Sequence, residues 1–256
     1  MVLARAGDQS RRCVDRARDR RRRRGPDLAD PVIGTPRVHH RAVDSTNERA
    51  RELAVRGAPH GTLVTAAEQT AGRGRQGRSW LAPAGDAVLM SVVLRDLDER
   101  FPLLPLAAAV AVAEACESLA PVRCEIKWPN DVWIERRKVA GILVEGRPAA
   151  GWAVLGVGVN VRSAPAELGD IATSIGAGVA VESALGALVD ALARWLGREG
   201  AQVLEAWRAR DALRGESVRW ADGAGTAAGI DDSGSLLVQS DTGLIALSAG
   251  EVHLQR

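Results

Sequence analysis

Several residue types are almost missing from this chain of 256 residues. It contains no tyrosine, one phenylalanine and two methionines. Of its 34 basic residues only Lys127 and Lys138 are lysines, and its only asparagines are Asn47, Asn130 and Asn160. Such scarcity indicates a composition bias against these types, so the positions where they persist are candidates for function. A lysine carries a compact, rotatable charge that the planar fork of arginine does not replace.

The cysteines, histidines and apolar runs exclude several classes of protein. Cys13, Cys116 and Cys124 are odd in number and show no CxxC spacing, which argues against a disulfide framework or zinc site and favours a reducing cytoplasm. The four histidines also lack metal-ligand spacing, so we predict no metal centre built from protein ligands. We see no apolar run as long as a membrane span, and the N-terminus lacks the apolar core of a signal peptide.

The net charge of +2 hides an uneven distribution. Residues 1–24 hold ten arginines and three aspartates, an excess of +7, so the rest of the chain carries about −5. The unbroken run from Arg20 to Arg24 could bind nucleic acid or another anionic surface. Because no aromatic or apolar residues alternate with these arginines, we favour a disordered tail over residues 1–36.

The hydrophobic pattern predicts an α+β domain over residues 37–212 and a small all-β domain over 213–256. Ser45 and Glu48 have the spacing of a capping box, which predicts a helix that begins there and stops at Gly57. Longer helices are predicted at 103–119 and 181–207, and strands at 37–44, 62–67, 87–94, 122–127, 132–135, 139–145 and 153–161. Short alternating runs separated by turn sequences predict C-terminal strands at 218–220, 236–238, 245–247 and 252–254.

A loop at residues 72–78 combines three glycines with Arg73, Arg75 and Arg78. Glycine permits close backbone approach to a ligand, and the guanidinium fork suits phosphate and carboxylate. Without a ligand the three like charges would repel one another and the loop would be mobile, so we expect an anion to order it. A flexible, solvated loop is the alternative. The loop is not a P-loop, because no Gly-Lys-Ser/Thr follows.

Four motifs stand in order along the chain. They are Gly72-Arg73-Gly74-Arg75-Gln76-Gly77-Arg78-Ser79-Trp80, Lys127-Trp128-Pro129-Asn130-Asp131, Lys138-Val139-Ala140-Gly141-Ile142-Leu143-Val144-Glu145 and Gly156-Val157-Gly158-Val159-Asn160-Val161. In this order they resemble the motifs of biotin protein ligases (biotin–acetyl-CoA-carboxylase ligases), and the resemblance covers about Val38 to the C-terminus. It implies a mixed, mostly antiparallel sheet with helices on one side, of the class II aminoacyl-tRNA synthetase and biotin ligase type. A small SH3-like β-barrel would follow.

The resemblance implies an ATP-dependent biotin–[biotin carboxyl-carrier protein] ligase. Such an enzyme joins biotin to ATP with the help of Mg²⁺, releases pyrophosphate and holds biotinyl-5′-AMP. It then transfers biotin to one lysine of a biotin carboxyl carrier protein, a subunit of acetyl-CoA or acyl-CoA carboxylase. Residues 1–36 are too short and too rich in arginine for the helix-turn-helix that some members carry, so we expect no sequence-specific DNA binding. We also expect no membrane association, and a homodimer is possible.

The resemblance also implies which residues form the site. The residues expected at biotin are Ser45, Thr46, Asn47, Gln69, Arg73, Gly74, Arg75, Lys138 and Gly141. The residues expected at ATP are Arg75, Arg78, Trp80, Asn130, Asp131 and Asn160. Lys138, Arg75 and Asp131 are the expected catalytic groups. A cation such as Lys138 between the biotin carboxylate and the α-phosphate would reduce their repulsion.

Some roles stay open at this point. Asp131 could orient the acceptor amine or hold Mg²⁺, or Asn130-Asp131 could be a plain turn. Asn160 could cap a buried turn or contact the ribose, and Lys127 could be a solvated strand end or make a functional contact. Trp128 could belong to the core or line the site. The rival functions are a lipoate or octanoate ligase of related fold, a non-catalytic biotin-sensing module, and an RNA-associated protein acting through the tail.

Overall fold

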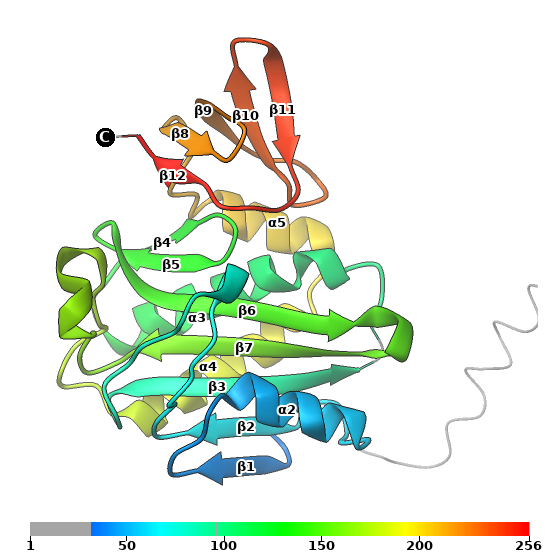
Figure 1. Cartoon of the computed structure of the whole chain (residues 1–256), viewed down its shortest axis with the longest axis vertical. Coiled ribbons are helices and arrows are strands. Elements are labelled where there is room, and N and C mark those ends of the chain that lie inside the picture. Colours follow the sequence, from blue (N-terminus) through cyan, green and yellow to red (C-terminus); the bar gives the residue numbers. More distant parts are fainter. Residues whose placement is uncertain (1–31, 96, 256) are drawn as a thin grey trace, which may run out of the picture. The chain divides into compact units, whose positions relative to one another are not determined.

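The computed structural model describes residues 32–95 and 97–255. Its larger part is a seven-stranded sheet in the order β1-β2-β3-β7-β6-β5-β4 (Figure 1). The strands are β1 (Arg37–His40), β2 (Leu63–Ala66), β3 (Ala87–Arg95), β4 (Cys124–Lys127), β5 (Asp131–Ile134), β6 (Arg137–Arg147) and β7 (Trp152–Asn160). All neighbouring strands are antiparallel except β1 and β2. The expected mixed, mostly antiparallel sheet is therefore confirmed.

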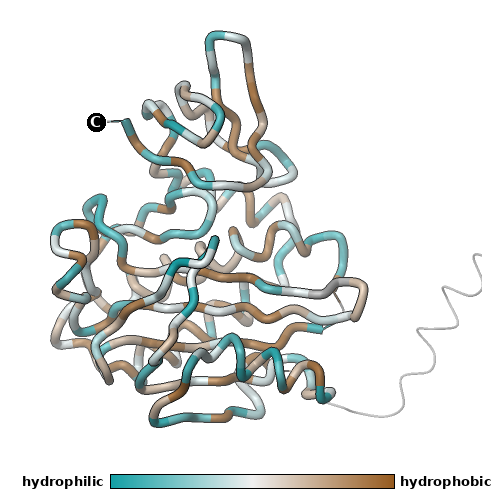
Figure 2. Tube along the Cα trace, in the orientation of Figure 1, coloured by the Kyte–Doolittle hydropathy of each residue, from teal (hydrophilic) through white to brown (hydrophobic). Residues whose placement is uncertain are grey.

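Helices cover both faces of this sheet, whereas the resemblance implied helices on one side. The helices α3 (Leu104–Leu119), α4 (Val181–Leu196) and α5 (Gly200–Arg208) belong to the main core, whereas α2 (Thr46–Val55) packs on the opposite face. In β3, Val92 lies in the main core and Val93 packs with Ala50 and Ala54 of α2. Burial on both faces explains why β3 is almost entirely apolar, with Ser91 and the terminal Arg95 as its polar residues. Figure 2 shows the same apolar character along β3, β7 and β6.

The helix α3 is more apolar than we expected. The segment Phe101–Leu119 is long and apolar enough to cross a membrane by length and composition, with a mean hydropathy of 1.4. That corrects the expectation that no run has this length. In the fold, 56% of the segment is buried, and alanines such as Ala108 and Ala111 lie fully inside the core. Their small side chains let α4 approach α3 closely.

The predicted helix at 181–207 is in fact two helices. The first, α4, ends at Leu196, and α5 begins at Gly200. Gly197 caps the end of α4, and Glu199 is extended, with φ −63° and ψ 144°. A side chain at Gly200 would meet Leu103 Cδ1 at 3.1 Å. The break therefore lets α5 turn and pack closely against the start of α3.

Residues before the predicted start of the main domain belong to the described fold. Residues 32–36, which we assigned to the tail, belong to the fold because Ile33 is buried. The N–H of Gly34 also donates to the carbonyl of Gly61 at 2.9 Å. The remainder of the predicted tail, residues 1–31, lies outside the described residues.

The start of α2 lacks the predicted capping box. Ser45 occupies the N-cap position with an extended backbone, but its side chain makes no capping hydrogen bond. Glu48 forms ion pairs with Arg51 and Arg73 instead of reaching back to Ser45. The end of α2 is as predicted, since Gly57 follows at φ 90°, a conformation that glycine adopts without strain. Ser45 consequently keeps a hydroxyl that lines the cavity described below.

The C-terminal part forms a five-stranded antiparallel sheet in the order β11-β10-β9-β8-β12. Its strands are β8 (Ser217–Trp220), β9 (Gly223–Ile230), β10 (Leu236–Ser240), β11 (Gly243–Leu247) and β12 (His253–Leu254). We did not predict β9, because its glycines and alanines carry little β-strand signal. Gly225 is needed there, since a Cβ atom would lie 2.4 Å from the carbonyl oxygen of Gln239. Closure of this sheet into a barrel stays a prediction.

Candidate active site

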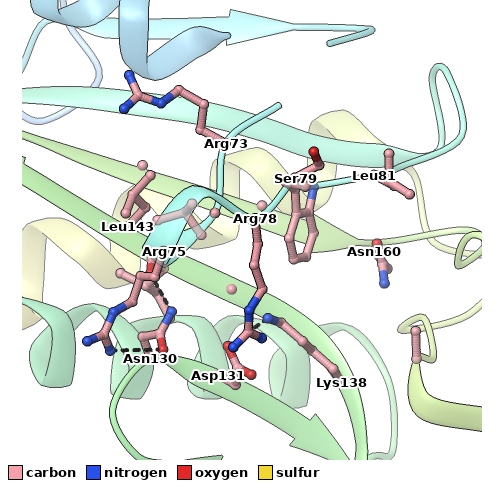
Figure 3. Close-up of a pocket in the computed structure, with 18 of the residues that line it drawn as sticks. Arg73, Arg75, Arg78, Ser79, Leu81, Asn130, Asp131, Lys138, Leu143 and Asn160 are labelled. Atoms are coloured by element: carbon pink, nitrogen blue, oxygen red, sulfur yellow. Dashed lines mark hydrogen bonds and ion pairs between the residues drawn. The ribbon is translucent and has the colours of Figure 1, made fainter. Parts of the chain in front are cut away.

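One cavity brings together every residue that we predicted for the site. Its volume is about 270 Å³, and it lies on β3, β7, β6 and β5 beside the start of α2. All fourteen predicted residues line it: Ser45, Thr46, Asn47, Gln69, Arg73, Gly74, Arg75, Arg78, Trp80, Asn130, Asp131, Lys138, Gly141 and Asn160. In Figure 3 the side chain of Arg78 points toward Asp131 and Lys138, whereas that of Arg73 points the other way.

The start of α2 forms an uncharged, hydrogen-bonding end of the cavity. Gln69 Oε1 accepts hydrogen bonds from the Thr46 N–H at 2.7 Å and from the Thr46 hydroxyl at 3.0 Å. Ser91 Oγ lies 2.8 Å from Thr46 Oγ1 and donates to Asn47 Oδ1 at 2.6 Å. Thr46, Asn47 and Ser91 are all buried, so these groups are held in place. Fixed amides and hydroxyls suit a neutral polar ligand group.

Asn47 is tied to the glycine–arginine loop through Glu145. Asn47 Nδ2 donates to Glu145 Oε2 at 2.9 Å, and Glu145 Oε1 pairs with Arg73 Nη2 at 2.9 Å. Glu48 makes a second ion pair with Arg73 at 3.2 Å. We predicted neither carboxylate as a site residue, although Glu145 ends the third motif. One carboxylate thus couples the uncharged end of the cavity to the loop.

Gly156 leaves the space that Asn47 occupies. A Cβ atom at Gly156 would lie 2.0 Å from Asn47 Oδ1 and 2.8 Å from its Cγ, far inside any allowed contact. The fourth motif contains Gly156, but its pattern did not show what the glycine faces. The partner comes from α2, more than a hundred residues earlier in the chain. The requirement for glycine here follows from packing between β7 and α2.

All three loop arginines have protein partners. Besides the Arg73 pairs, Arg78 pairs with Glu251, which precedes β12. Arg75 Nη1 lies 3.3 Å from Asn130 Oδ1, and its Nη2 lies 3.4 Å from the carbonyl oxygen of Gly250. The expected repulsion between the arginines is therefore offset by groups of the protein itself. No local sequence signal indicated the contacts from the C-terminal part.

Burial lowers the pKa of two cations in the cavity wall, Arg75 and Lys127. In both cases removal from water is the main cause of the lower pKa, and the nearby Asp131 carboxylate acts in the opposite direction. Lys127 Nζ also lies 5.7 Å from the centroid of the Trp133 ring. Lys127 is therefore a wall residue and not a solvated strand end. Partly dehydrated cations attract an anion more strongly than exposed ones do.

Lys138 and Asp131 form an ion pair across β5 and β6. Lys138 Nζ lies 2.7 Å from Asp131 Oδ1 and 5.5 Å from the centroid of the Trp80 ring. A register shift in β5 between Val132 and Trp133 places Lys138 opposite Trp133. An ammonium has three donors, so Lys138 can keep its bond to Asp131 while it donates to an anionic ligand.

Trp80 fits against the strands because two facing residues are glycines. A Cβ atom at Gly158 would lie 2.4 Å from Trp80 Cε2, and one at Gly141 would lie 3.0 Å from Trp80 Cζ3 and 3.2 Å from Lys138 Cε. A side chain at Gly141 would thus crowd Trp80 and Lys138. Trp80 Nε1 is buried and has no partner within residues 32–95 and 97–255.

Of the two roles left open for Asn160, the structure shows the one at a buried turn, and contact with the ribose stays a prediction. The side-chain Nδ2 of Asn160 donates to the backbone carbonyl of Thr173 at 3.0 Å, and the backbone carbonyl of Asn160 accepts from the Ile175 N–H at 3.1 Å. Asn160 therefore holds a buried turn. Its Oδ1 is buried without a partner in the described part of the chain, and the residue lines the cavity. An acceptor is thus left for a ligand hydroxyl. Trp128 likewise serves both core and cavity wall.

A divalent cation would have to arrive with a ligand. Among the described residues no group of three or more His, Cys, Asp or Glu could hold a metal ion. The cavity lining contains two carboxylates, Asp131 and Glu251. Magnesium is usually held by one or two carboxylates together with substrate phosphates. The residues present therefore fit a magnesium ion bound to a nucleotide.

Known proteins share both parts of this architecture. Residues 40–161 match the Biotin/lipoate A/B protein ligase family, and residues 215–254 match the Biotin protein ligase C terminal domain. The bifunctional ligase/repressor BirA of Bacillus subtilis (strain 168) is 35% identical over 249 residues, which cover 89% of this chain and 76% of that protein. The chain belongs to the biotin protein ligase family.

A further relative and a solved structure are similar to most of this chain. The biotin–[acetyl-CoA-carboxylase] ligase of Mycobacterium tuberculosis (strain ATCC 25618 / H37Rv) is 37% identical over 232 residues, covering 82% of this chain and 86% of that protein. The solved structure of biotin protein ligase from Aquifex aeolicus in complex with biotin and ATP has a TM-score of 0.76 and 28% identity, covering 87% of this chain and 99% of that one. The family and fold that the motifs indicated are confirmed.

Proposed function

We propose that this protein is an ATP-dependent biotin–[biotin carboxyl-carrier protein] ligase that forms and holds biotinyl-5′-AMP. One observation carries the proposal: a single cavity contains an uncharged end at Thr46 and Asn47 together with the cations Arg75, Arg78 and Lys138. The neutral ureido ring of biotin suits the first, and phosphate groups suit the second. The names of the relatives, and a structural neighbour solved with biotin and ATP, support the same assignment.

In the first step a biotin carboxylate oxygen attacks the α-phosphorus of ATP. The bond from that phosphorus to the β-phosphate bridging oxygen breaks, and pyrophosphate leaves with the electron pair. Lys138 lowers the repulsion between the two anions and stabilises the charge that develops between them. Its ion pair with Asp131 holds the ammonium in the cavity beforehand. Arg78 must exchange Glu251 for a phosphate, which costs little because that ion pair is about half exposed.

Asp131 has two proposed roles that an experiment can separate. It would hold the Mg²⁺ that accompanies ATP and neutralises part of the triphosphate charge, or it would orient the acceptor amine in the second step. In that step the amine nitrogen attacks the biotinyl carbonyl carbon, and AMP leaves. If Asp131→Asn raises the Mg²⁺ requirement of pyrophosphate release, Asp131 holds the cation. If only transfer slows, Asp131 orients the amine.

The ligase proposal is tested by mixing the protein with biotin and labelled ATP. We expect pyrophosphate release that depends on biotin, with labelled adenylate retained on the protein. Absence of biotin-dependent release over a wide range of Mg²⁺ concentrations would refute the proposal. A competition between biotin and lipoate tests the closest rival, and lipoate should not displace labelled biotin.

The acceptor is proposed to be a carrier domain of an acetyl-CoA or acyl-CoA carboxylase, consistent with the names of the relatives. The absence of sequence-specific DNA binding stays a prediction, and selective operator binding in a gel shift at physiological salt would contradict it. The cytoplasmic location and the possible homodimer also stay predictions.

A further inference from the structure

A second cavity lies behind the glycine–arginine loop. It has a volume of about 210 Å³, and six of its lining residues also line the active-site cavity: Arg75, Trp128, Pro129, Asn130, Ile142 and Leu143. Its outer wall comes from the C-terminal part, at Gly234 and Ser248. Trp128 Nε1 donates to the carbonyl of Gly234 at 3.0 Å, which ties the two parts together at this point. The second cavity therefore borders the active-site cavity and extends to Gly234 and Ser248, which the active-site cavity does not reach.

The walls of the second cavity are mainly apolar. Pro102 precedes α3, and Pro105 and Leu106 lie in the first turn of α3. Leu143 and Val144 come from β6. The indole N–H of Trp128 is already used within the protein. Apolar side chains together with the polar groups of Arg75 and Asn130 suit a flexible methylene chain that ends in an amine.

Arg75 is the weakly held part of the partition between the two cavities. Its hydrogen bonds to Asn130 at 3.3 Å and to the carbonyl of Gly250 at 3.4 Å are longer than usual, whereas Asn130 itself donates to the carbonyl of Ile142 at 2.8 Å. The ion pairs of Arg73 with Glu145 and of Lys138 with Asp131 are much shorter, at 2.9 Å and 2.7 Å. An anion in the active site attracts the Arg75 guanidinium. Binding of an adenylate would therefore draw Arg75 away from Asn130 and open the partition.

We propose that the second cavity is the channel through which the acceptor lysine reaches the adenylate. This proposal rests on the proposed ligase function. The methylene groups of the lysine lie between the apolar walls, and its Nζ enters past Arg75 and Asn130. The nitrogen then bonds to the biotinyl carbonyl carbon, the carbon–oxygen bond to AMP breaks, its electron pair stays on AMP, and one proton leaves to water. The positive charge of Arg75 near the inner end favours the neutral amine, which is the nucleophile.

The test narrows the channel at its outer mouth. Ser248 is exposed and lines the second cavity but not the active-site cavity, so Ser248→Trp narrows the channel without reaching the biotin or ATP positions. Thr242→Trp is the matched control, because Thr242 is an exposed residue of the same domain that lines neither cavity. Two acceptors are compared, a purified carrier domain and Nα-acetyl-lysine methylamide. The small amide cannot contact the wider protein surface.

We expect Ser248→Trp to lower biotin transfer to both acceptors at least tenfold, while pyrophosphate release stays within twofold and the control variant is unchanged. Unchanged transfer to the small amide would overturn the channel, even if transfer to the carrier domain fell. If Ser248→Trp misfolds and loses pyrophosphate release, Pro102→Trp replaces it, because Pro102 is exposed and also lines the second cavity. The same changes in biotin transfer and pyrophosphate release are then expected. Failure of the unsubstituted protein to release pyrophosphate would instead refute the ligase function itself.

Discussion

Replacing Gly156 by alanine tests whether packing of β7 against α2 sets the uncharged end of the site. The added methyl carbon would stand 2.0 Å from Asn47 Oδ1. Asn47 cannot simply rotate away, because it is buried and bonded to Ser91 at 2.6 Å and to Glu145 at 2.9 Å. Relief of the clash therefore requires the loss or distortion of at least one of these hydrogen bonds.

The expected magnitude follows from the two hydrogen bonds of Asn47. The bond to the Ser91 hydroxyl is neutral and contributes about 1 kcal/mol, and the bond to the charged Glu145 contributes about 1.5–3 kcal/mol. Water can replace part of the Glu145 bond, because that side chain is 30% exposed. We expect Gly156→Ala to lower the free energy of unfolding by about 2–4 kcal/mol. Displacement of Asn47 should also raise the KM for biotin roughly threefold to tenfold.

Urea denaturation and the biotin-dependent release of pyrophosphate measure the two effects. Gly186→Ala is the control, because Gly186 lies exposed on α4 with no atom near its added Cβ. Alanine there should raise the free energy of unfolding by about 0.5–1 kcal/mol. The reasoning would be refuted if Gly156→Ala had a free energy of unfolding within about 0.5 kcal/mol of the unsubstituted protein, a typical surface effect, and an unchanged KM for biotin.

Three further predictions concern charged groups. Lys138→Ala should slow pyrophosphate release at least 100-fold, which corresponds to about 3 kcal/mol of transition-state stabilisation. The control Arg137→Ala, at the neighbouring residue, should change the rate less than about threefold. A loss of only two- or threefold in Lys138→Ala would contradict the mechanism. Glu145→Gln should shorten the lifetime of bound biotinyl-5′-AMP several-fold in a release assay. The free energy of unfolding should change by less than about 1 kcal/mol, because the lost ion pair with Arg73 is partly exposed. An unchanged lifetime would show that this ion pair does not hold the loop. Burial raises the pKa of the Asp211 carboxyl above its usual 3.8. The protonated carboxyl therefore favours the folded state below about pH 4, and this stabilisation is lost as the pH rises through the raised pKa. Asp211→Asn should therefore have a higher Tm than the unsubstituted protein at pH 7 and an equal Tm near pH 4, whereas the exposed Asp241→Asn should show no such trend.

The sheet and the site residues were largely predictable because their signals are local. Apolar runs and turn residues located all seven strands of the main sheet within a few residues. The four motifs contain ten of the fourteen predicted site residues, and the other four are Ser45, Thr46, Asn47 and Gln69. The errors arose where a local pattern had a competing explanation. The helical spacing of apolar residues continues past Gly197, although α4 ends at Leu196 and α5 begins at Gly200. Glu48 forms ion pairs with Arg51 and Arg73 and therefore does not complete the capping box. The strand β9 was missed because glycine and alanine carry little signal of their own.

The sequence by itself determined the family, the order of the motifs and the residue types at the site, because short-range patterns carry that information. Only the tertiary structure decided which groups hold those residues. Arg75 reaches Gly250, 175 residues away along the chain, and Arg78 reaches Glu251. Likewise Gly156 is required by Asn47 on a distant helix. Such contacts depend on how β7, α2 and the C-terminal part pack in three dimensions, and no local pattern encodes that packing. The second cavity behind Arg75 exists for the same reason.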